Sequence, residues 1–270
     1  MKKAEKQSLD ELPDEKKELL SINIGEWLLT DAKIALKDEQ MPVRKLLLGQ
    51  DGPTLSDAGR AWLTSLGARA LSLFEVRQLK PGQGFLVRDL LSTESADLWV
   101  AESKLSHSLV LWDIFGARLV KSEADNKLSG AVYPFLRETA NSCKSKIIRK
   151  VKGLDPSSEE VREIRCSLIT TEWLRSLVTS HSSESTEGAV SEQQIDLSPD
   201  SFNTWVEEPL VALGDRSPRS ALRTAPGRRA VVELLKTYEN QNVHHVKIFG
   251  GEAFEFTPLW DLLGLKRDED

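Results

Sequence analysis

The residues best suited by type to do chemistry are the adjacent histidines His244 and His245, because imidazole is a common metal ligand. Glu252 and Glu255 follow closely and could add oxygen ligands to one of them. Neighbouring side chains point in different directions on a helix or a strand, so the two histidines cannot easily share one ion. We therefore interpret this stretch as a polar connection between two helices and expect no metal site.

Catalytic nucleophiles with a suitable base are scarce in the sequence. The chain has two cysteines, Cys143 and Cys166, without His or Cys neighbours at metal-ligand spacing, so we interpret both as reduced thiols. The paired carboxylates Glu207 and Glu208 lie beside Pro209 in an expected surface turn, whereas acid–base catalysis needs a partly buried pair. Neither a phosphate-binding glycine loop nor a Gly-x-Ser-x-Gly elbow is present. We expect neither catalysis nor a bound cofactor.

Composition narrows the possible partners and compartments. The 36 Lys and Arg residues against 42 Asp and Glu residues give a net charge of -6, which argues against a surface that binds nucleic acid throughout. The first twenty residues are charged throughout and lack the apolar segment of a signal peptide. No stretch approaches the roughly 20 apolar residues that a membrane span needs. We therefore expect a cytoplasmic protein with no membrane partner.

Two regions could still contact nucleic acid locally. Residues 144–152 form a basic run, which is usually a solvated helix face but could also bind phosphates. Its basic residues are Lys144, Lys146, Arg149, Lys150 and Lys152. A small β unit upstream of this run offers basic and aromatic side chains among several acidic ones. Its candidates are Arg77, Lys80, Arg88, Lys104, Arg118, Phe85 and Trp99.

The elements that would position a binding site are marked most clearly between residues 205 and 235. Ser217 is expected to cap a short helix that Pro218 begins. Thr224 is expected to cap a longer helix, on which Val231, Leu234, Leu235 and Tyr238 recur at helical spacing. The sequence thus predicts two helices that meet at an elbow, with Trp205 and Leu213 in the angle between them.

The order of elements predicts an α+β fold: N-terminal helices, a small bent β-sheet or partly open barrel, then a mostly helical part. Strand-like alternation begins at residue 71 and recurs in short segments up to residue 120. The expected regions are helical 1–70, the β unit 71–122, a bridge with a long helix 123–180, a flexible linker 181–200 and a helical block 201–270.

Two helices are expected to form a packed scaffold before and after the β unit. The first spans residues 22–36 and carries Ile24, Trp27, Leu28 and Ala35 on one apolar face. The second spans residues 159–178, and its apolar stripe consists of Val161, Ile164, Leu168, Ile169, Trp173 and Leu177.

The C-terminal block holds a spaced set of residues: Trp205, Pro209, Ala212, Leu213, Gly214, Ser217, Pro218, Thr224, Gly227, Val232 and Leu235. In this set the block resembles the toxin-binding and dimerising domain at the end of Xre- and ParS-type antitoxins. The sequence departs from the family pattern at Asp215, which replaces a second glycine, and at Ala225-Pro226, which shifts a Thr-Pro dipeptide by one residue.

A longer resemblance covers most of residues 20–265. Uncharacterised bacterial proteins that often carry a SEC-C zinc-binding motif share the same block and a similar ending, here Phe256, Leu259, Leu263, Gly264 and Leu265. They also have segments like residues 72–76, 81–91 and 106–113, the last of which includes Trp112-Asp113. The cysteine-rich SEC-C motif is absent here, so its zinc site is not carried over.

We predict a non-enzymatic bacterial interaction or regulatory protein that binds a partner protein, or a second copy of itself, through the C-terminal block. The residues assigned to this interaction are Trp205, Pro209, Leu213, Arg216, Pro218, Arg219 and Arg223. Trp205, Leu213, Pro218 and Val232 are expected to hold the shape of the block, and the arginines to form its exposed polar side. The alternative is a nucleic-acid-associated factor that uses the β unit and the basic run 144–152.

Overall fold

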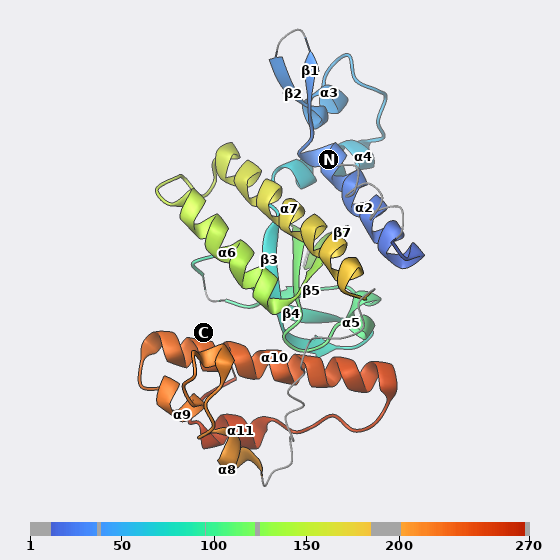
Figure 1. Cartoon of the computed structure of the whole chain (residues 1–270). Helices are drawn as coiled ribbons and strands as arrows, with labels where there is room; N and C mark the ends of the chain where they lie inside the picture. The colour runs from blue at the N-terminus through green and yellow to red at the C-terminus, as the bar shows by residue number, and fades with distance from the viewer. Residues whose placement is uncertain (1–11, 37–38, 95, 122–124, 185–200, 268–270) are drawn as a thin grey trace. The chain divides into compact units, whose positions relative to one another are not determined.

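The computed structural model describes residues 12–36, 39–94, 96–121, 125–184 and 201–267 (Figure 1). The chain divides into two compact units. Unit 1 comprises Met1–Leu109 and Asp113–Glu187, and unit 2 comprises Val110–Trp112 and Gly188–Asp270. The three residues Val110–Trp112 therefore leave unit 1 and join the C-terminal unit. The predicted α+β class is confirmed, since unit 1 holds the strands and unit 2 is built from helices.

Unit 1 is organised around a closed five-stranded barrel with the strand order β3-β4-β5-β7-β6. The strands are β3 (Ser72–Lys80), β4 (Gly84–Asp89), β5 (Leu98–Val100), β6 (Ile114–Lys121) and β7 (Asn126–Phe135). Their pairing is antiparallel except between β5 and β7, which meet in parallel at Val100 and Asn126. The barrel core contains Phe74, Val76, Phe85, Val87, Val100, Phe115 and Ala117. The sheet thus closes fully, instead of staying partly open.

Strand β7 corrects the predicted organisation of this region. The sequence predicts a bridge over residues 123–135, but β7 completes the barrel by pairing with β6 along most of its length and with β5 at Asn126. Gly130 and Pro134 interrupt the strand pattern here, and both residues are unfavourable inside strands. The boundary predicted after residue 122 therefore divides the barrel.

Two helices pack side by side against the barrel wall, α6 (Arg137–Val151) and α7 (Glu159–Glu184) (Figure 1). The predicted second helix is confirmed and runs six residues past its expected end. Trp173 on α7 meets Tyr133 on β7 edge to face, with 5.1 Å between the ring centroids. Cys143 and Cys166 lie in this same core as free thiols. Burial raises the pKa of each thiol to about 12, so both stay protonated at neutral pH.

The N-terminal elements of unit 1 differ from the predicted helix 22–36. The observed elements are α2 (Asp14–Thr30), β1 (Lys33–Leu36), β2 (Glu39–Pro42), α3 (Val43–Leu48) and α4 (Asp57–Gly67). Helix α2 ends at Thr30, and Ala35 lies in a two-stranded ribbon of β1 and β2. The expected apolar face of α2 does not pack inward: Ile24, Trp27 and Leu28 are 43, 37 and 46% exposed. The buried residues of α2 are instead Asn23, Glu26 and Thr30.

Hydrogen bonds to the barrel explain this reversed orientation. Asn23 donates from Nδ2 to the carbonyl oxygen of Val132 at 2.8 Å and accepts from the Val132 amide at 3.1 Å. Glu26 accepts from the Ala131 amide at 3.2 Å and pairs with Arg118 of β6 at 3.1 Å. The side chains of α2 thereby bond backbone groups of β7 beyond Asn126, the one β7 residue in register with β5.

The linker predicted over residues 181–200 lies largely outside the described residues, although α7 includes its first four positions. Residues 1–11 also lie outside them. Of the helices in the described ranges, none is both long enough and apolar enough to cross a membrane.

Candidate partner-binding block

Unit 2 contains the helical block that the sequence predicts. Its elements are α8 (Phe202–Trp205), the 3-10 turn η2 (Val211–Leu213), α9 (Pro218–Ala221), α10 (Ala225–Phe249) and α11 (Thr257–Leu262). Both predicted caps are confirmed: Ser217 Oγ accepts from the Ser220 amide at 3.2 Å, and Thr224 Oγ1 accepts from the Gly227 amide at 3.1 Å. The short helix and the long helix therefore begin where their capping residues indicate.

The elbow between α9 and α10 requires glycine at position 227. A Cβ atom there would lie 2.1 Å from the carbonyl oxygen of Ala221 and 2.9 Å from Thr224 Oγ1. Gly227 is buried in the first turn of α10, where that helix crosses the end of α9. The glycine thus sets the close approach of the two helices.

A tight turn precedes α9 and positions the arginines that follow it. The Leu210 amide donates to the Arg216 carbonyl oxygen at 3.2 Å, and the Asp215 amide donates to the Leu210 carbonyl oxygen at 3.1 Å. Gly214 and Asp215 both adopt positive φ, 65° and 57°. Asp215 stands where the antitoxin pattern has a second glycine, and this left-handed conformation explains the preference for glycine there.

The predicted shape-forming residues of the block are buried. Trp205, Leu213 and Val232 are 5, 3 and 3% exposed and belong to one apolar core with residues of α10 and α11. Pro218 is buried as well. The Trp205 ring meets Tyr238 at 6.1 Å between centroids, and its Nε1 has no hydrogen-bond partner among the described residues. These burials show a structural role; whether Trp205 or Leu213 also contacts a partner stays a prediction.

A buried carboxylate on α10, that of Glu239, holds two tryptophans. Glu239 is 6% exposed and accepts from Trp112 Nε1 at 3.0 Å and from Trp260 Nε1 at 3.3 Å. Arg267 pairs with its other oxygen at 2.7 Å. Lys236, also buried, lies 4.8 Å from the centroid of the Trp112 ring. This cluster ties the segment Val110–Trp112 and the C-terminal residues to one helix.

Sequence reasoning did not assign Trp112 to this block, because 127 residues separate it from Glu239. Asn240 Nδ2 also donates to the Leu111 carbonyl oxygen at 2.9 Å, so backbone and side chain both hold the segment. Trp112 adopts a φ of 70°, an uncommon value for a bulky residue. In the sequence, Trp112 stood out only as part of the pair Trp112-Asp113 in the longer family resemblance, which did not indicate that it packs against α10.

The remaining residues assigned to partner binding lie on the surface. Pro209, Arg216, Arg219 and Arg223 are exposed. Arg219 pairs with Glu207, and Arg216 Nε donates to the Leu213 carbonyl oxygen at 3.1 Å. Glu207 therefore forms an exposed ion pair at the surface of the block. The turn and α9 carry cationic side chains that face solvent in a chain of net charge -6.

The two histidines lie on a continuous helix, not in a connection between helices. Helix α10 extends through His244 and His245 to Phe249, and His245 packs against Phe249 with 4.7 Å between ring centroids. Within the described ranges no group of three His, Cys, Asp or Glu side chains is arranged to hold a metal ion.

The nucleic-acid candidates divide into buried and exposed residues. Phe85 is fully buried in the barrel, and the side chains of Arg77 and Arg118 are 4% exposed and ion-paired. These three residues cannot contact a nucleic acid, which corrects that part of the prediction. The other β-unit cations differ in setting: Arg88 pairs with Asp97 at 2.8 Å, and Lys80 lies over Trp99 at 5.5 Å.

The basic run 144–152 stays on the surface of α6 and just beyond its end. Arg149, Lys150 and Lys152 are exposed, and Lys144 is partly so. Lys146 pairs with Glu172 of α7 at 2.9 Å, which assigns it to helix packing. The exposed cationic surface of the run therefore consists mainly of Arg149, Lys150 and Lys152, fewer than the five basic residues in the sequence.

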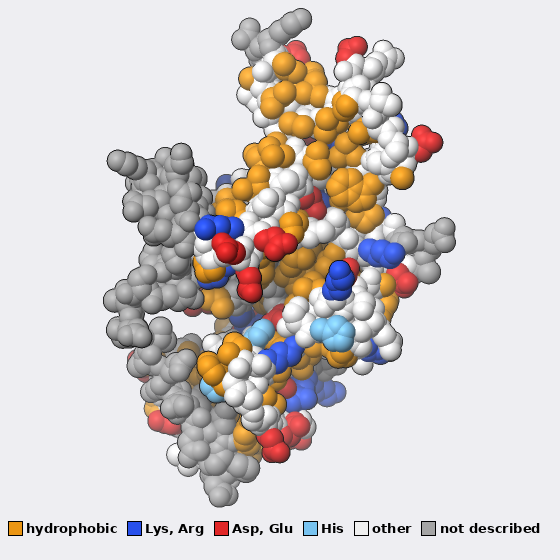
Figure 2. Space-filling model, turned by 90° about the vertical axis from the view of Figure 1, so that its right-hand side faces the viewer, with side chains coloured by type: hydrophobic (Ala, Val, Ile, Leu, Met, Phe, Trp, Pro, Cys, Tyr) orange, Lys and Arg blue, Asp and Glu red, His pale blue; other side chains and the backbone are white. Residues whose placement is uncertain are grey.

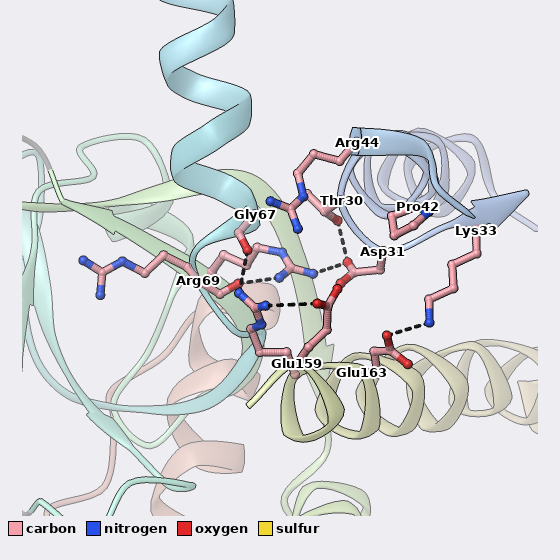
Figure 3. A pocket seen from close by; sticks show the side chains of 11 residues that line it. Thr30, Asp31, Lys33, Pro42, Arg44, Gly67, Arg69, Glu159 and Glu163 are labelled. Carbon is pink, nitrogen blue, oxygen red and sulfur yellow. Dashed lines mark hydrogen bonds and ion pairs between the residues drawn. The ribbon is translucent and has the colours of Figure 1, made fainter. Parts of the chain in front are cut away.

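A cleft in unit 1 is lined by several charged side chains (Figure 3). Arg118 at its floor pairs with Glu26 and Asp31, and its Nη1 donates to the Arg69 carbonyl oxygen at 2.7 Å. Lys33 pairs with Glu163 at 2.6 Å. The Arg69 guanidinium points away from these groups in Figure 3. The cavity measures about 30 Å³, enough for one or two water molecules. Its ion pairs and hydrogen bonds join α2, β1, β6 and α7.

Residues 197–240 match the family model described as the antitoxin Xre/MbcA/ParS C-terminal toxin-binding domain. The match covers α8 to the middle of α10, where the caps, the elbow and the positive-φ turn lie. No match was found among curated proteins or among solved structures. The chain therefore carries an antitoxin-like domain near its C-terminus, which indicates protein binding, and the comparisons do not extend to the rest of the chain.

Proposed function

We propose that this protein is a non-enzymatic bacterial regulatory protein that binds a partner protein through the C-terminal block of unit 2. The observation that carries the proposal is the match of residues 197–240 to a toxin-binding domain. The block has its own apolar core and fixed elbow, so it presents one defined surface. A preformed surface binds without the entropy cost of ordering a loop.

The partner would meet the side of the block that carries the turn 210–216 and α9. Arg216, Arg219 and Arg223 are exposed there, and arginine is enriched among the residues that dominate binding energy at interfaces. Arginine also forms paired hydrogen bonds with carboxylates. We infer that the contacted face of the partner is acidic. The complex is proposed to form in the cytoplasm, without a cofactor.

Affinity capture of the tagged full chain from a bacterial host tests the proposal, with mass spectrometry of the captured proteins before and after nuclease treatment. The variant Arg219→Glu/Arg223→Glu reverses two exposed charges of the block. Its matched control, Arg149→Glu/Lys150→Glu, reverses two exposed charges on α6. We expect a stoichiometric protein partner that survives nuclease, is lost in the first variant and is retained in the control.

The alternative function is a nucleic-acid-associated factor, and the exposed cations Arg149, Lys150 and Lys152 on and beyond α6 favour it. Partners lost on nuclease treatment, or abolished by the α6 variant alone, would contradict the first proposal and favour this one. Phosphate contacts would also make the affinity fall steeply with salt. The wider resemblance to SEC-C-associated proteins stays a prediction and contributes no function of its own.

A further inference from the structure

Unit 1 exposes an apolar face that the described part of the chain leaves uncovered. We define this N-terminal apolar face by Ile24, Trp27 and Leu28 on α2, Ile34 and Leu36 on β1, and Trp62 on α4; their exposed fractions run from 37 to 46%. Figure 2 shows hydrophobic side chains gathered over α2 and the N-terminal elements beside it. Contiguous apolar surface of this kind marks an interaction site more often than chance exposure.

The orientation of α2 is fixed, so the face cannot turn inward. Rolling the helix would remove Asn23 from both backbone groups of Val132, and Glu26 from the Ala131 amide and from Arg118. Each buried group left without a partner costs about 1–3 kcal/mol. The polar side of α2 is therefore held against the barrel, and its apolar side faces outward.

The strand β1 of the ribbon adds Ile34 and Leu36 to the face, and a two-stranded ribbon needs further packing contacts to be stable. All four residues of β1 are exposed, and β1 pairs only with β2 in the described part of the chain. An isolated two-stranded ribbon is marginally stable in water. Because Ile34 and Leu36 are two residues apart, they lie on the same side of the ribbon. A surface packed against that side would bury both residues and stabilise the strand pair.

The size of the face matches what a homodimer needs. A tryptophan offers about 150–250 Å² and isoleucine or leucine somewhat less, so the six side chains at the observed exposures present on the order of 450 Å² of apolar surface. Each partner in a standard interface contributes about 800 Å², of which a little over half is apolar, again roughly 450 Å². The six residues that define the face are all uncharged, so an identical face can pack against it without placing like charges together.

We propose that a second copy of this chain covers the N-terminal apolar face and forms a two-fold symmetric dimer. In such an interface the same patch serves both subunits, with α2 and β1 of one copy against those of the other. The surface is separate from the partner-binding block of unit 2. A dimer through unit 1 would present two such blocks, so partner binding would gain from bivalency.

Sedimentation equilibrium of the full chain tests this proposal between about 1 and 100 µM, the range of moderate affinities. We expect the wild type to sediment at twice the monomer mass of 30.2 kDa. The variant Ile24→Lys/Leu28→Lys places two charges on the face and should raise the dissociation constant by about 100-fold or more. Both side chains are exposed, so the melting temperature of the variant checks that its fold is intact.

Matched variants separate this surface from others. Leu136→Lys/Ile148→Lys changes two exposed apolar residues of unit 1 outside the face and should leave the dimer mass unchanged. Arg219→Glu/Arg223→Glu in unit 2 should leave it unchanged as well, which keeps this test independent of the proposed function. A monomeric wild type throughout the range would overturn the proposal. So would a dimer that survives Ile24→Lys/Leu28→Lys, or one that the Leu136→Lys/Ile148→Lys control dissociates equally.

Discussion

Each unit holds a buried charged side chain with several partners, Arg118 in unit 1 and Glu239 in unit 2, and the two differ in how that charge is compensated. In unit 1, Arg118 meets the carboxylates of Glu26 and Asp31, and its side chain is 4% exposed. In unit 2, Glu239 meets two neutral indole N–H groups and Arg267, whose side chain is 38% exposed. The first is a buried ionic cluster; the second is a carboxylate held largely by hydrogen bonds.

The comparison indicates how far each unit depends on its charge. Burial by itself lowers the pKa of Arg118, yet Asp31 and other nearby negative charges outweigh it and raise the pKa, so the guanidinium stays charged. Removing one member of a buried ion pair leaves the other uncompensated, which costs more than losing one hydrogen bond. We therefore expect unit 1 to depend on its cluster more strongly than unit 2 does.

The largest effect is expected for Arg118→Leu. It leaves the buried Glu26 and the half-buried Asp31 without their counter-ion and should lower the free energy of unfolding of unit 1 by about 3–5 kcal/mol. Urea unfolding followed by peptide-level hydrogen exchange separates the units, since protection should fall in residues 72–135 and persist in residues 201–267. A loss below 1 kcal/mol would contradict the expected dependence of unit 1 on its ion cluster, because the cluster would then contribute no more than an exposed ion pair.

The next effect is expected for Trp205→Ala, which removes an apolar contact from unit 2 without touching Glu239. The ring is 5% exposed, and its Nε1 has no partner to lose among the described residues, so the loss is one of packing. We expect about 3 kcal/mol, measured as a lower urea midpoint for residues 201–267. Val211→Ala is the control, because Val211 is 83% exposed and should change stability little.

A smaller effect is expected for Glu239→Gln. Both indole N–H groups donate to one oxygen of Glu239, which the amide keeps. The change removes the charge that pairs with Arg267, so about 1.5–3 kcal/mol should be lost from unit 2. Urea unfolding followed by hydrogen exchange, as for Arg118→Leu, allows the losses in free energy of unfolding to be compared between the two units. A loss as large as that of Arg118→Leu would show that Glu239 acts as a buried ion-pair member and not mainly as a hydrogen-bond acceptor.

The smallest effect, and the one of opposite sign, is expected for Asp215→Gly. Asp215 adopts a φ of 57°, which glycine accepts without the strain of a Cβ atom. We expect the free energy of unfolding of unit 2 to rise by about 1 kcal/mol. Thermal unfolding should show a higher midpoint. Ser217→Ala, which removes the neighbouring N-cap, should lower it by a similar amount. A decrease for Asp215→Gly would mean that the carboxylate itself stabilises the turn.

The sequence by itself determined the features that rest on local chemistry. Ser217, Pro218 and Thr224 fix the starts of α9 and α10 because capping depends on residues three positions apart. The alternation after residue 71 gave the first strands of the barrel, and the burial of Trp205 and Leu213 followed from the elbow. The arginines of the block were predicted on its exposed side, because they alternate with the apolar residues that fill the elbow.

The tertiary structure alone decided the features that rest on partners distant in sequence. Helix α2 turns its polar side inward because Asn23 and Glu26 meet backbone groups of β7 more than 100 residues away. Strand β7 closes the barrel despite Gly130 and Pro134, since pairing with β6 supplies what its own pattern lacks. Trp112 joins unit 2 through Glu239 in the same way. Burial and hydrogen bonding between remote segments outweigh local periodicity. Periodicity identified the apolar face of α2, and the hydrogen bonds to the barrel decided that this face points away from the core of unit 1.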